Sequence, residues 1–258
     1  MKHKAYAIVI GILFILSSFT MKSRFLNVRQ VEAENWVEAK AECVMEANSR
    51  RILYAAHGDT RLPMASTTKI LTAITVLNAC VDISEELIVP EQAVGVEGSS
   101  VYLKSGEKYS VRDLLYGLML RSGNDCATAL AWKIGGNVVN FSAMMNIMAQ
   151  KAGAFQSNFV NPHGLPAKNH YTTAIDLCLI TAYAMQNSVF REIVSTKYYA
   201  PQNWKNKNKM LTSVSGAIGV KTGYTKEAGR CLVSAIEREG MTLICTVLGC
   251  PTTYERSI

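Results

Sequence analysis

The sequence predicts an α+β fold in which strands from both ends of the chain form one antiparallel, five-stranded sheet. Strand-like segments occur only near the two ends, at residues 39–46, 51–56, 217–222, 229–237 and 242–249. Apolar residues at helical spacing occur between them, at 66–80, 110–121, 125–134, 140–152 and 172–187. Turn residues join the first two strands at 47–50 and the last two at 239–240. Terminal strands around a helical middle are expected to meet in a single sheet flanked by helices.

The first 33 residues differ from the rest of the 258-residue chain. Lys2 and Lys4 precede an uncharged stretch over residues 5–21, and a polar segment follows it. This order is typical of a secretory signal, with a cleavage site after Ala33. An uncleaved N-terminal membrane anchor stays open as the alternative, although the apolar run is short for a span. In both cases we expect residues 34–258 to be exported to the cell envelope or secreted.

The positive charge of the chain is concentrated in this leader. Residues 1–33 carry five Lys/Arg and one Glu, a net charge of +4, so their removal would lower the total from +7 to +3. The basic composition is therefore no evidence for a nucleic-acid partner. A basic cluster at 204–209 could suggest single-strand binding through its tryptophan and lysines. We interpret it as a solvated loop.

The cysteines and histidines predict no cofactor and no metal site. Seven cysteines leave at least one thiol unpaired, and most lie in apolar stretches, as Cys178 and Cys245 do. Such cysteines usually act as small buried hydrophobic residues. Neither they nor the four histidines show a zinc-binding spacing.

The first motif that could carry out a chemical reaction is the pair Ser66 and Lys69. Residues three apart on a helix lie on the same face. A lysine can take the serine proton if its amine is neutral, and burial together with a second cation such as Lys221 would lower its pKa. Pro63 disfavours helix before it, so Ser66 is expected near a helix N-terminus, where free N–H groups favour a developing oxyanion. The alternative is a simple N-cap serine with a solvated lysine.

The second motif is Ser122-Gly123-Asn124. It follows an apolar helical stretch that Ser110 and Asp113 are expected to cap. Gly123 breaks that helix and would place the serine and the asparagine on a loop between two helices. A hydroxyl there can relay a proton, and an amide can steady a lysine and bind a substrate carbonyl. By itself the tripeptide is also an ordinary helix-to-helix turn.

The third motif is Lys221-Thr222-Gly223, in a predicted strand that also contains Gly219. Glycine within a strand often marks the close approach of a ligand or another backbone. A lysine beside a threonine hydroxyl suits a terminal carboxylate. A water-facing edge strand explains one such tripeptide equally well, but all three motifs in this order favour a single active site.

With these motifs and their flanks, the chain resembles the low-molecular-mass penicillin-binding proteins. These are serine-type D-alanyl-D-alanine carboxypeptidases of the penicillin-recognising serine peptidase family, which act on peptidoglycan stem peptides. The resemblance begins near Ala39 and rests on residues 62–73, 119–125, 161–165 and 220–225. It implies a β-lactamase/DD-peptidase-like fold with a helical lobe over about residues 82–200. It also implies covalent inhibition by β-lactam antibiotics at Ser66, and it leads us to expect a catalytic domain cut short at the C-terminus.

The resemblance also implies a role for each motif residue. Ser66 would attack the carbonyl between two D-alanines, with Lys69 as the base. Ser122 would pass the proton to the leaving amine. The implied binding residues are Asn124 for the peptide, Lys221, Thr222 and Gly223 for the terminal carboxylate, and the N–H groups of Ser66 and Tyr224 for the oxyanion. Arg256 falls where relatives often place an arginine after the last strand.

Two other functions are weighed against this one. A class A-like β-lactamase would carry a glutamate in a Glu-x-x-Leu-Asn pattern, and the corresponding stretch at 159–165 has none. A catalytically silent penicillin-binding envelope protein would not need the nucleophile, the base and the relay together. We interpret His163, within that stretch, as a structural turn residue and not as a base.

Overall fold

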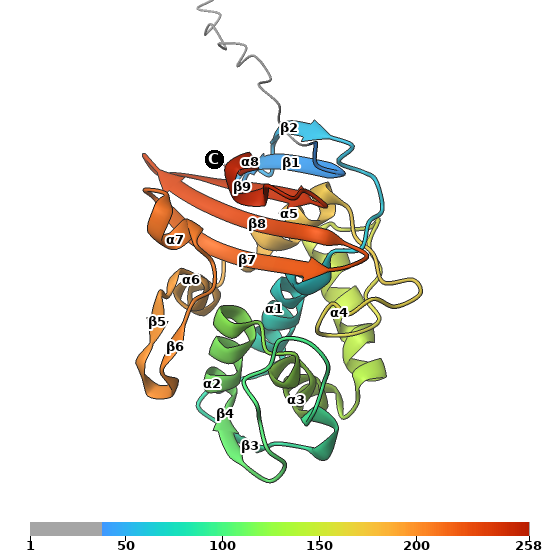
Figure 1. The fold of residues 1–258 in the computed structure, drawn as a ribbon, viewed down its shortest axis with the longest axis vertical. Coiled ribbons are helices and arrows are strands. Elements are labelled where there is room, and N and C mark those ends of the chain that lie inside the picture. Colours follow the sequence, from blue (N-terminus) through green and yellow to red (C-terminus); the bar gives the residue numbers. More distant parts are fainter. Residues whose placement is uncertain (1–37, 258) are drawn as a thin grey trace, which may run out of the picture. The chain divides into compact units, whose positions relative to one another are not determined.

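The structure is a computed structural model that describes residues 38–257, and its centre is a five-stranded antiparallel sheet. The strand order is β2-β1-β9-β8-β7 (Figure 1). β1, near the start of the chain, pairs along its whole length with β9, near the end. The predicted α+β class and sheet are therefore confirmed. The bounds of the strands are β1 (Ala41–Glu46), β2 (Ile52–Ala56), β7 (Ala217–Thr225), β8 (Gly229–Arg238) and β9 (Met241–Leu248).

The helices of the middle region also lie where the sequence places them. They are α1 (Lys69–Ala79), α2 (Val111–Tyr116), α3 (Asn124–Gly135), α4 (Val138–Ala152) and α5 (Ala174–Ala184). A 3-10 turn, η1 (Ala65–Thr68), precedes α1, and a π-helical turn, η3 (Gly117–Arg121), follows α2. The sequence analysis did not predict the shorter elements β3 (Glu86–Ile88), η2 (Glu91–Ala93), β4 (Lys108–Ser110), α6 (Ser188–Ser195), β5 (Tyr198–Tyr199), η4 (Ala200–Gln202), β6 (Trp204–Lys205), α7 (Met210–Ser213) and α8 (Thr253–Arg256).

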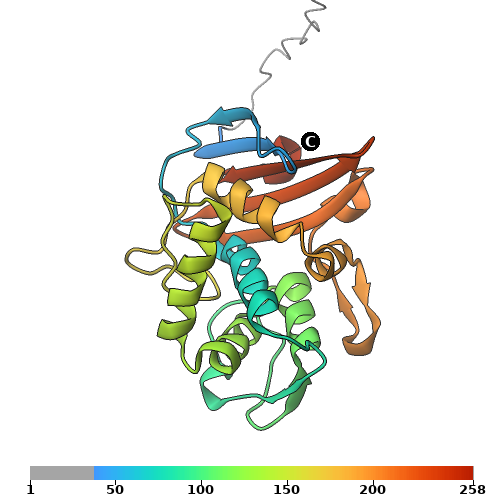
Figure 2. The same cartoon turned by 180° about the vertical axis from the view of Figure 1, so that it is seen from behind.

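Helices cover the inner face of the sheet, and α8 lies on the opposite face. α5 packs against β1 and β9, and α6 packs against β7, as the view from behind shows (Figure 2). Cys43 of β1, Cys178 of α5 and Thr246 of β9 meet on the inner face, where the Cys178 thiol lies 3.1 Å from the Thr246 hydroxyl. The interpretation of the cysteines as buried hydrophobic residues is confirmed for five of the seven, Cys43, Cys126, Cys178, Cys231 and Cys250.

Helix α1 joins the sheet to the helical lobe. It is buried from Lys69 to Val76 and contacts α3, α4 and α5. Its leading turn η1 packs against β7, which is an edge strand of the sheet. The chain therefore carries Ser66 to the junction between the sheet edge and the helices.

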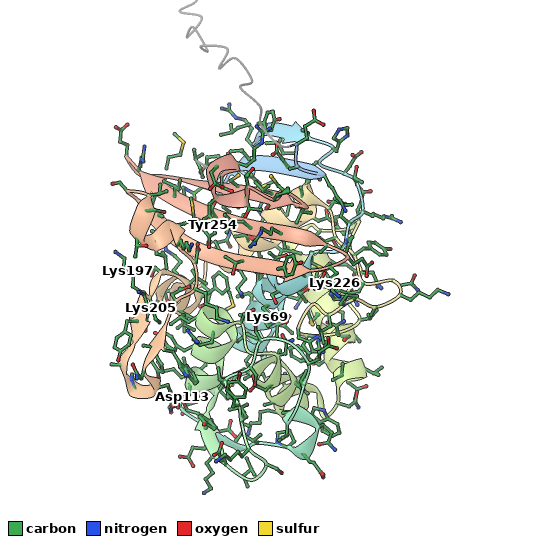
Figure 3. The ribbon with its side chains drawn as sticks, viewed as in Figure 1. Lys69, Asp113, Lys197, Lys205, Lys226 and Tyr254 are labelled. Atoms are coloured by element: carbon green, nitrogen blue, oxygen red, sulfur yellow. The ribbon has the colours of Figure 1, made fainter. Side chains whose placement is uncertain are left out.

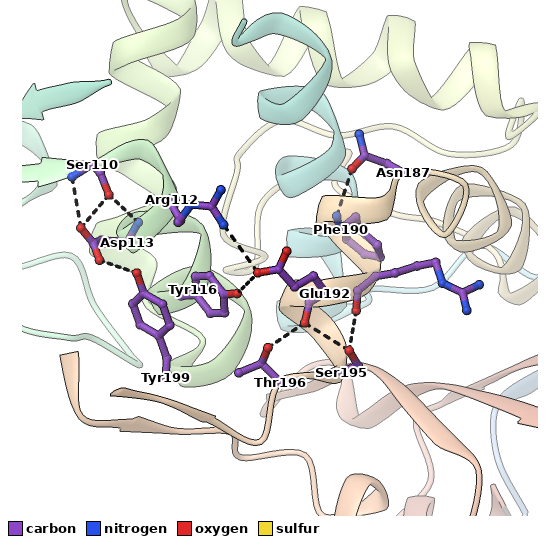
Figure 4. A network of polar contacts seen from close by, with 11 residues as sticks. Ser110, Arg112, Asp113, Tyr116, Asn187, Phe190, Glu192, Ser195, Thr196 and Tyr199 are labelled. Atoms are coloured by element: carbon purple, nitrogen blue, oxygen red, sulfur yellow. Dashed lines mark hydrogen bonds and ion pairs between the residues drawn. The ribbon is translucent and has the colours of Figure 1, made fainter. Parts of the chain in front are cut away.

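A polar network fixes α2 against α6 and the β5–β6 hairpin (Figure 4). Ser110 and Asp113 form the predicted capping box of α2, and Asp113 also accepts a hydrogen bond from the Tyr199 hydroxyl at 2.8 Å. The Tyr199 ring stacks on the Tyr116 ring, with 3.8 Å between the two ring centroids. The Tyr116 hydroxyl donates to the Glu192 carboxylate of α6 at 2.8 Å. The network holds the end of α2, and the turn that follows it, in a defined position.

The predicted signal or anchor over residues 1–33 lies outside the described residues. Within residues 38–257, none of the helices has the length and apolar character needed to cross a membrane.

Candidate active site

Ser66 lies on the 3-10 turn η1 and lines a cleft of about 360 Å³. The residue before it, Ala65, has a φ of 49°, which is unfavourable for a residue with a Cβ. Gly164 makes this backbone possible, because a Cβ at residue 164 would lie 1.9 Å from the Ala65 carbonyl oxygen. The lining residues of the cleft are Ser66, Ser99, Ser122, Lys207, Lys209, Thr222, Gly223, Tyr224, Arg230, Cys231, Thr253 and Tyr254.

Lys69, labelled in Figure 3, lies one turn after Ser66 and is fully buried. Its amine contacts three oxygens. Its Nζ is 3.0 Å from Ser66 Oγ, 2.7 Å from Asn124 Oδ1 and 2.6 Å from the His163 carbonyl oxygen. The two carbonyl oxygens can only accept hydrogen bonds. A neutral amine has two hydrogens and one lone pair, so those hydrogens satisfy the carbonyls and the lone pair faces the Ser66 hydroxyl. The same geometry suits an ammonium once the proton has moved.

The surroundings of Lys69 favour its neutral form. Burial, and after it the charge of Lys221, hold the pKa of Lys69 well below its usual range. Asp125 acts in the opposite direction, but its effect is smaller and its carboxylate is engaged by Ser100 and by the N–H groups of Val101 and Leu103. Desolvating a full charge costs several kcal/mol. The expectation that burial and a second cation lower the pKa of this lysine is confirmed.

The orientation of Asn124 is fixed by a loop distant in sequence. Its Nδ2 donates to the Glu97 carbonyl oxygen, which leaves Oδ1 to face Lys69. Gly98 has a φ of +92°, and a Cβ there would lie 2.8 Å from Asn124 Nδ2. The sequence analysis predicted Asn124 on the loop between two helices. It is instead the first residue of α3, one position past the end of that loop.

Ser122 lines the cleft from the turn between η3 and α3. Its φ is 65°, in the left-handed region, because the chain reverses there after the π-helical turn. A Cβ at the next residue, Gly123, would lie 2.7 Å from Asp125 Oδ1 and 2.8 Å from Cys126 Sγ. The glycine therefore lets the turn pack closely on α3 and present the Ser122 side chain to the cleft.

Strand β7 forms the opposite wall of the cleft. A Cβ at Gly223 would lie only 3.0 Å from the Ser66 backbone nitrogen, so glycine allows the two backbones to approach closely. Thr222 and Tyr224 line the cleft on either side of it. Lys221 lies behind this surface: it is 2% exposed, and its Nζ donates to the Thr222 carbonyl oxygen at 2.9 Å. Burial, and after it the charge of Lys207, lower the pKa of Lys221 to about 7.

His163 lies in a turn, which agrees with its interpretation as a structural residue. Its Nδ1 accepts from the Leu165 backbone N–H at 3.2 Å, and its carbonyl oxygen contacts Lys69. Burial is the largest cause that lowers the pKa of His163 to about 3, so its ring is neutral at physiological pH.

The structure thus brings the three motifs to one cleft, but it adds residues that the sequence analysis missed. Lys207 and Lys209 are exposed, as expected of a solvated loop, yet both line the cleft. Their place in the basic cluster at 204–209 was the available signal. Arg256 does not line the cleft: its guanidinium bonds the Glu42 carboxylate on β1, with Nη2 2.7 Å from Oε2.

The fold and the arrangement of serine, buried lysine and second serine define a penicillin-recognising serine peptidase. The family model described as D-alanyl-D-alanine carboxypeptidase matches residues 28–252, and the chain belongs to that family. Its predicted membership is confirmed.

Individual relatives agree with this assignment. The chain is 30% identical to D-alanyl-D-alanine carboxypeptidase DacF of Bacillus subtilis, over 100% of this chain and 68% of that protein. It is 40% identical to a Streptomyces D-alanyl-D-alanine carboxypeptidase, over 76% and 75% of the two chains. The crystal structure of a Streptomyces DD-transpeptidase superimposes with a TM-score of 0.79 at 37% identity, covering 86% of this chain and 93% of that one.

The pH dependence of acylation tests the influence of Lys221 on Lys69. Acylation needs the neutral amine, so its rate falls as the pH drops below the pKa of Lys69. Lys221→Gln removes a neighbouring positive charge and thereby raises that pKa. The acidic limb of the acylation rate, measured with a fluorescent penicillin, is expected to move to higher pH. Lys205→Gln makes the same charge change at an exposed position and serves as the control. An acidic limb that stays in place or moves to lower pH contradicts the account.

Gly223→Ala tests the close approach of β7 to Ser66. The added methyl group would press on the Ser66 N–H and on the Met64 carbonyl oxygen, 3.1 Å away. We expect a fall of about 100-fold in the acylation rate, of the size seen when one oxyanion donor is lost. Thermal unfolding of the variant should stay cooperative. If the folded variant is acylated at the parental rate, acylation does not depend on the close approach of β7 to Ser66.

Proposed function

We propose that the protein is a serine D,D-carboxypeptidase that removes the terminal D-alanine from peptidoglycan pentapeptide stems through an acyl-enzyme on Ser66. The observation that carries this proposal is the position of Lys69 Nζ between two carbonyl acceptors and the Ser66 hydroxyl. A serine held against a neutral, buried amine is an activated nucleophile. Membership of the D-alanyl-D-alanine carboxypeptidase family supports the same reaction.

Acylation begins when Lys69 takes the Ser66 proton and Oγ attacks the carbonyl carbon of the penultimate D-alanine. The carbonyl oxygen becomes an oxyanion, for which the N–H groups of Ser66 and Tyr224 are the proposed donors. Collapse of this intermediate breaks the peptide bond. The proton held by Lys69 passes through Ser122 to the leaving nitrogen, and D-alanine departs as an amine. The acyl group stays on Ser66.

Deacylation repeats the steps with water as the nucleophile. Lys69, again neutral, takes a proton from the water with Ser122 beside it, and the attack of the oxygen releases the shortened stem. The proton then returns to Ser66 Oγ. The Asn124 side chain, held between Lys69 and the Glu97 carbonyl oxygen, would contact the substrate peptide from the helical side of the cleft.

Carboxypeptidase activity is favoured over β-lactamase activity by the segment at 159–165. The group of this segment that contacts Lys69 is the His163 carbonyl oxygen, which cannot act as a base. Among the described residues, no aspartate or glutamate lines the cleft. A penicilloyl group on Ser66 would therefore lack a carboxylate to activate water, and we expect its hydrolysis to be slow. A silent penicillin-binding protein is disfavoured by the joint presence of Ser66, Lys69 and Ser122.

This function places the protein in the cell envelope. Its partners would be peptidoglycan stem peptides and, as covalent inhibitors at Ser66, β-lactam antibiotics. The proposal extends to a cleavable signal or an N-terminal anchor over residues 1–33, which the structure does not describe.

Release of D-alanine from diacetyl-L-Lys-D-Ala-D-Ala tests the proposal directly. The parent protein should release it, and Ser66→Ala should release none. Lys69→Ala should lower the rate by about 10²–10⁴-fold, the usual contribution of a general base. Labelling by a fluorescent penicillin should persist on the parent protein for many catalytic turnovers.

Two outcomes would exclude the proposal in favour of its competitors. Rapid hydrolysis of benzylpenicillin would point to a β-lactamase. A folded protein that takes the penicillin label but releases no D-alanine would point to a silent penicillin-binding protein. A Lys205→Ala variant, changed at an exposed site, controls for non-specific effects on the assay.

A further inference from the structure

His170 is a buried histidine that has no part in the mechanism described above. It is 6% exposed, does not line the cleft, and its ring packs edge-on against Phe159 with 5.8 Å between the ring centroids. Both ring nitrogens have a polar partner. The Val160 backbone N–H donates to Nδ1 at 3.1 Å, and Nε2 lies 3.0 Å from the Thr68 hydroxyl oxygen. The ring therefore has one defined orientation between two segments of the chain.

The two partners determine which nitrogen of the ring carries the hydrogen. A backbone N–H can only donate, so Nδ1 must accept and has no hydrogen. A neutral imidazole then has its one hydrogen on Nε2, which donates to Thr68 Oγ1. Burial is the largest cause that lowers the pKa of His170 to about 4, so the ring is neutral at neutral pH. His170 is therefore a hydrogen-bond donor to Thr68.

Thr68 connects this histidine to the backbone just before Ser66. Its hydroxyl has one hydrogen, which donates to the Ala65 carbonyl oxygen at 2.8 Å. A hydroxyl that also accepts a hydrogen bond donates more strongly, because hydrogen bonds in a chain polarise one another. His170, which lies 102 residues after Thr68 in the sequence, thereby supports the Ala65 carbonyl oxygen.

The peptide group that begins with this carbonyl ends at the Ser66 nitrogen, one of the two proposed oxyanion donors. A trans peptide group is planar, and its C=O and N–H point in opposite directions. A Cβ at Gly164 would lie 1.9 Å from the Ala65 carbonyl oxygen, and a Cβ at Gly223 would lie 3.0 Å from the Ser66 nitrogen. The carbonyl therefore faces one segment and the nitrogen faces β7. A hydrogen bond that holds the carbonyl oxygen also fixes the direction of the N–H.

We propose that His170 is a positioning residue for acylation, which orients the Ser66 N–H toward the oxyanion through Thr68 and the Ala65 carbonyl oxygen. The unfavourable φ of Ala65, 49°, explains why this peptide group needs such a support. The proposal rests on acylation of Ser66, which is part of the proposed function. Because the oxyanion forms only in the transition state, His170 should affect the rate of acylation and not the binding of the substrate.

Two amide variants separate the Nε2 donor from the rest of the ring. The amide of His170→Gln can still donate near the former Nε2 position, whereas the amide of His170→Asn is too short to reach Thr68. With a fluorescent penicillin, we expect the first-order acylation rate constant of His170→Asn to fall about 10-fold, less than the 10²–10³-fold loss of a whole oxyanion donor. His170→Gln should retain most of the parental rate. The penicillin concentration that gives half of the maximal rate should not change in either variant.

The acyl-enzyme itself reports the orientation of the Ser66 N–H. Its ester carbonyl occupies the proposed oxyanion hole, and a weaker hydrogen bond there raises the stretching frequency of that carbonyl. Infrared difference spectra with a ¹³C-labelled penicillin should show this band at higher frequency in His170→Asn and in Thr68→Val than in the parent protein. The double variant should shift the band no further, because both substitutions interrupt the same chain of hydrogen bonds. A role of His170 in stability alone would lower the thermal stability without shifting the band.

The control is His57→Asn, the same substitution at an exposed histidine whose φ of 51° asparagine tolerates. It should leave the rate and the band unchanged. If His170→Asn does not fold, Thr68→Val and Thr68→Ser make the same comparison, since only serine keeps the hydroxyl. An unchanged band in the folded variant without the donor or the hydroxyl, or equal losses of rate in His170→Asn and His170→Gln, would overturn the proposal.

The proposal can also be tested separately from the proposed function. If penicillin does not acylate the parent protein, the proposed function fails, and the amide signal of Ser66 in ¹H–¹⁵N nuclear magnetic resonance spectra takes the place of the acyl-enzyme. This signal should shift in His170→Asn and stay near its parental position in His170→Gln. A Ser66 signal that keeps its parental position in both variants would show that His170 does not orient this N–H.

Discussion

The protonation state of Lys69 is the constraint on which the rest of the site depends. Its amine is buried where two carbonyl oxygens and one hydroxyl surround it, and no carboxylate of residues 38–257 contacts it. Leaving one buried donor without a partner costs about 1–3 kcal/mol, and a buried charge without an opposite charge costs more. The neutral amine avoids both costs, and its remaining lone pair faces Ser66. The same oxygens that satisfy the hydrogens of the buried amine therefore also keep it neutral and able to act as a base.

Much of the surrounding structure serves to keep these few atoms in position. Gly164 and Gly223 let two backbone segments approach the turn that carries Ser66, and Gly98 lets the Glu97 carbonyl oxygen reach Asn124. Asp125 holds the loop of residues 100–103 through its carboxylate. Each contact joins segments that are distant in sequence, so the site depends on the packing of the sheet against the helical lobe.

The sequence predicts the fold well where local signals are strong. The five sheet strands and the helices from α1 to α5 have clear periodicity and turn residues at their ends. The sequence does not predict helix α6 because it follows α5 after only three residues, the last of which is its cap Asn187, and none of the three is a glycine or a proline. The strands of the two small antiparallel pairs, β3–β4 and β5–β6, have two or three residues each, too few to show alternation.

The same limit applies to the site. The three motifs predict Ser66, Lys69, Ser122 and Asn124 as site residues. Their spacing within a helix or a turn indicates which reactive side chains lie close together. The left-handed backbone of Ala65 and the position of Lys207 follow from contacts with Gly164 and Leu120, which lie about 100 residues away in the chain. No local pattern reports such contacts.

Direct titration of the Lys69 amine is the most direct test of the account. Nuclear magnetic resonance of lysine labelled with ¹³C and ¹⁵N, with the signal assigned through its loss in Lys69→Ala, reports the charge of this one side chain. The account predicts a neutral amine at neutral pH, with a pKa well below that of the exposed lysines. An amine that is charged at neutral pH and titrates with the exposed lysines would contradict it.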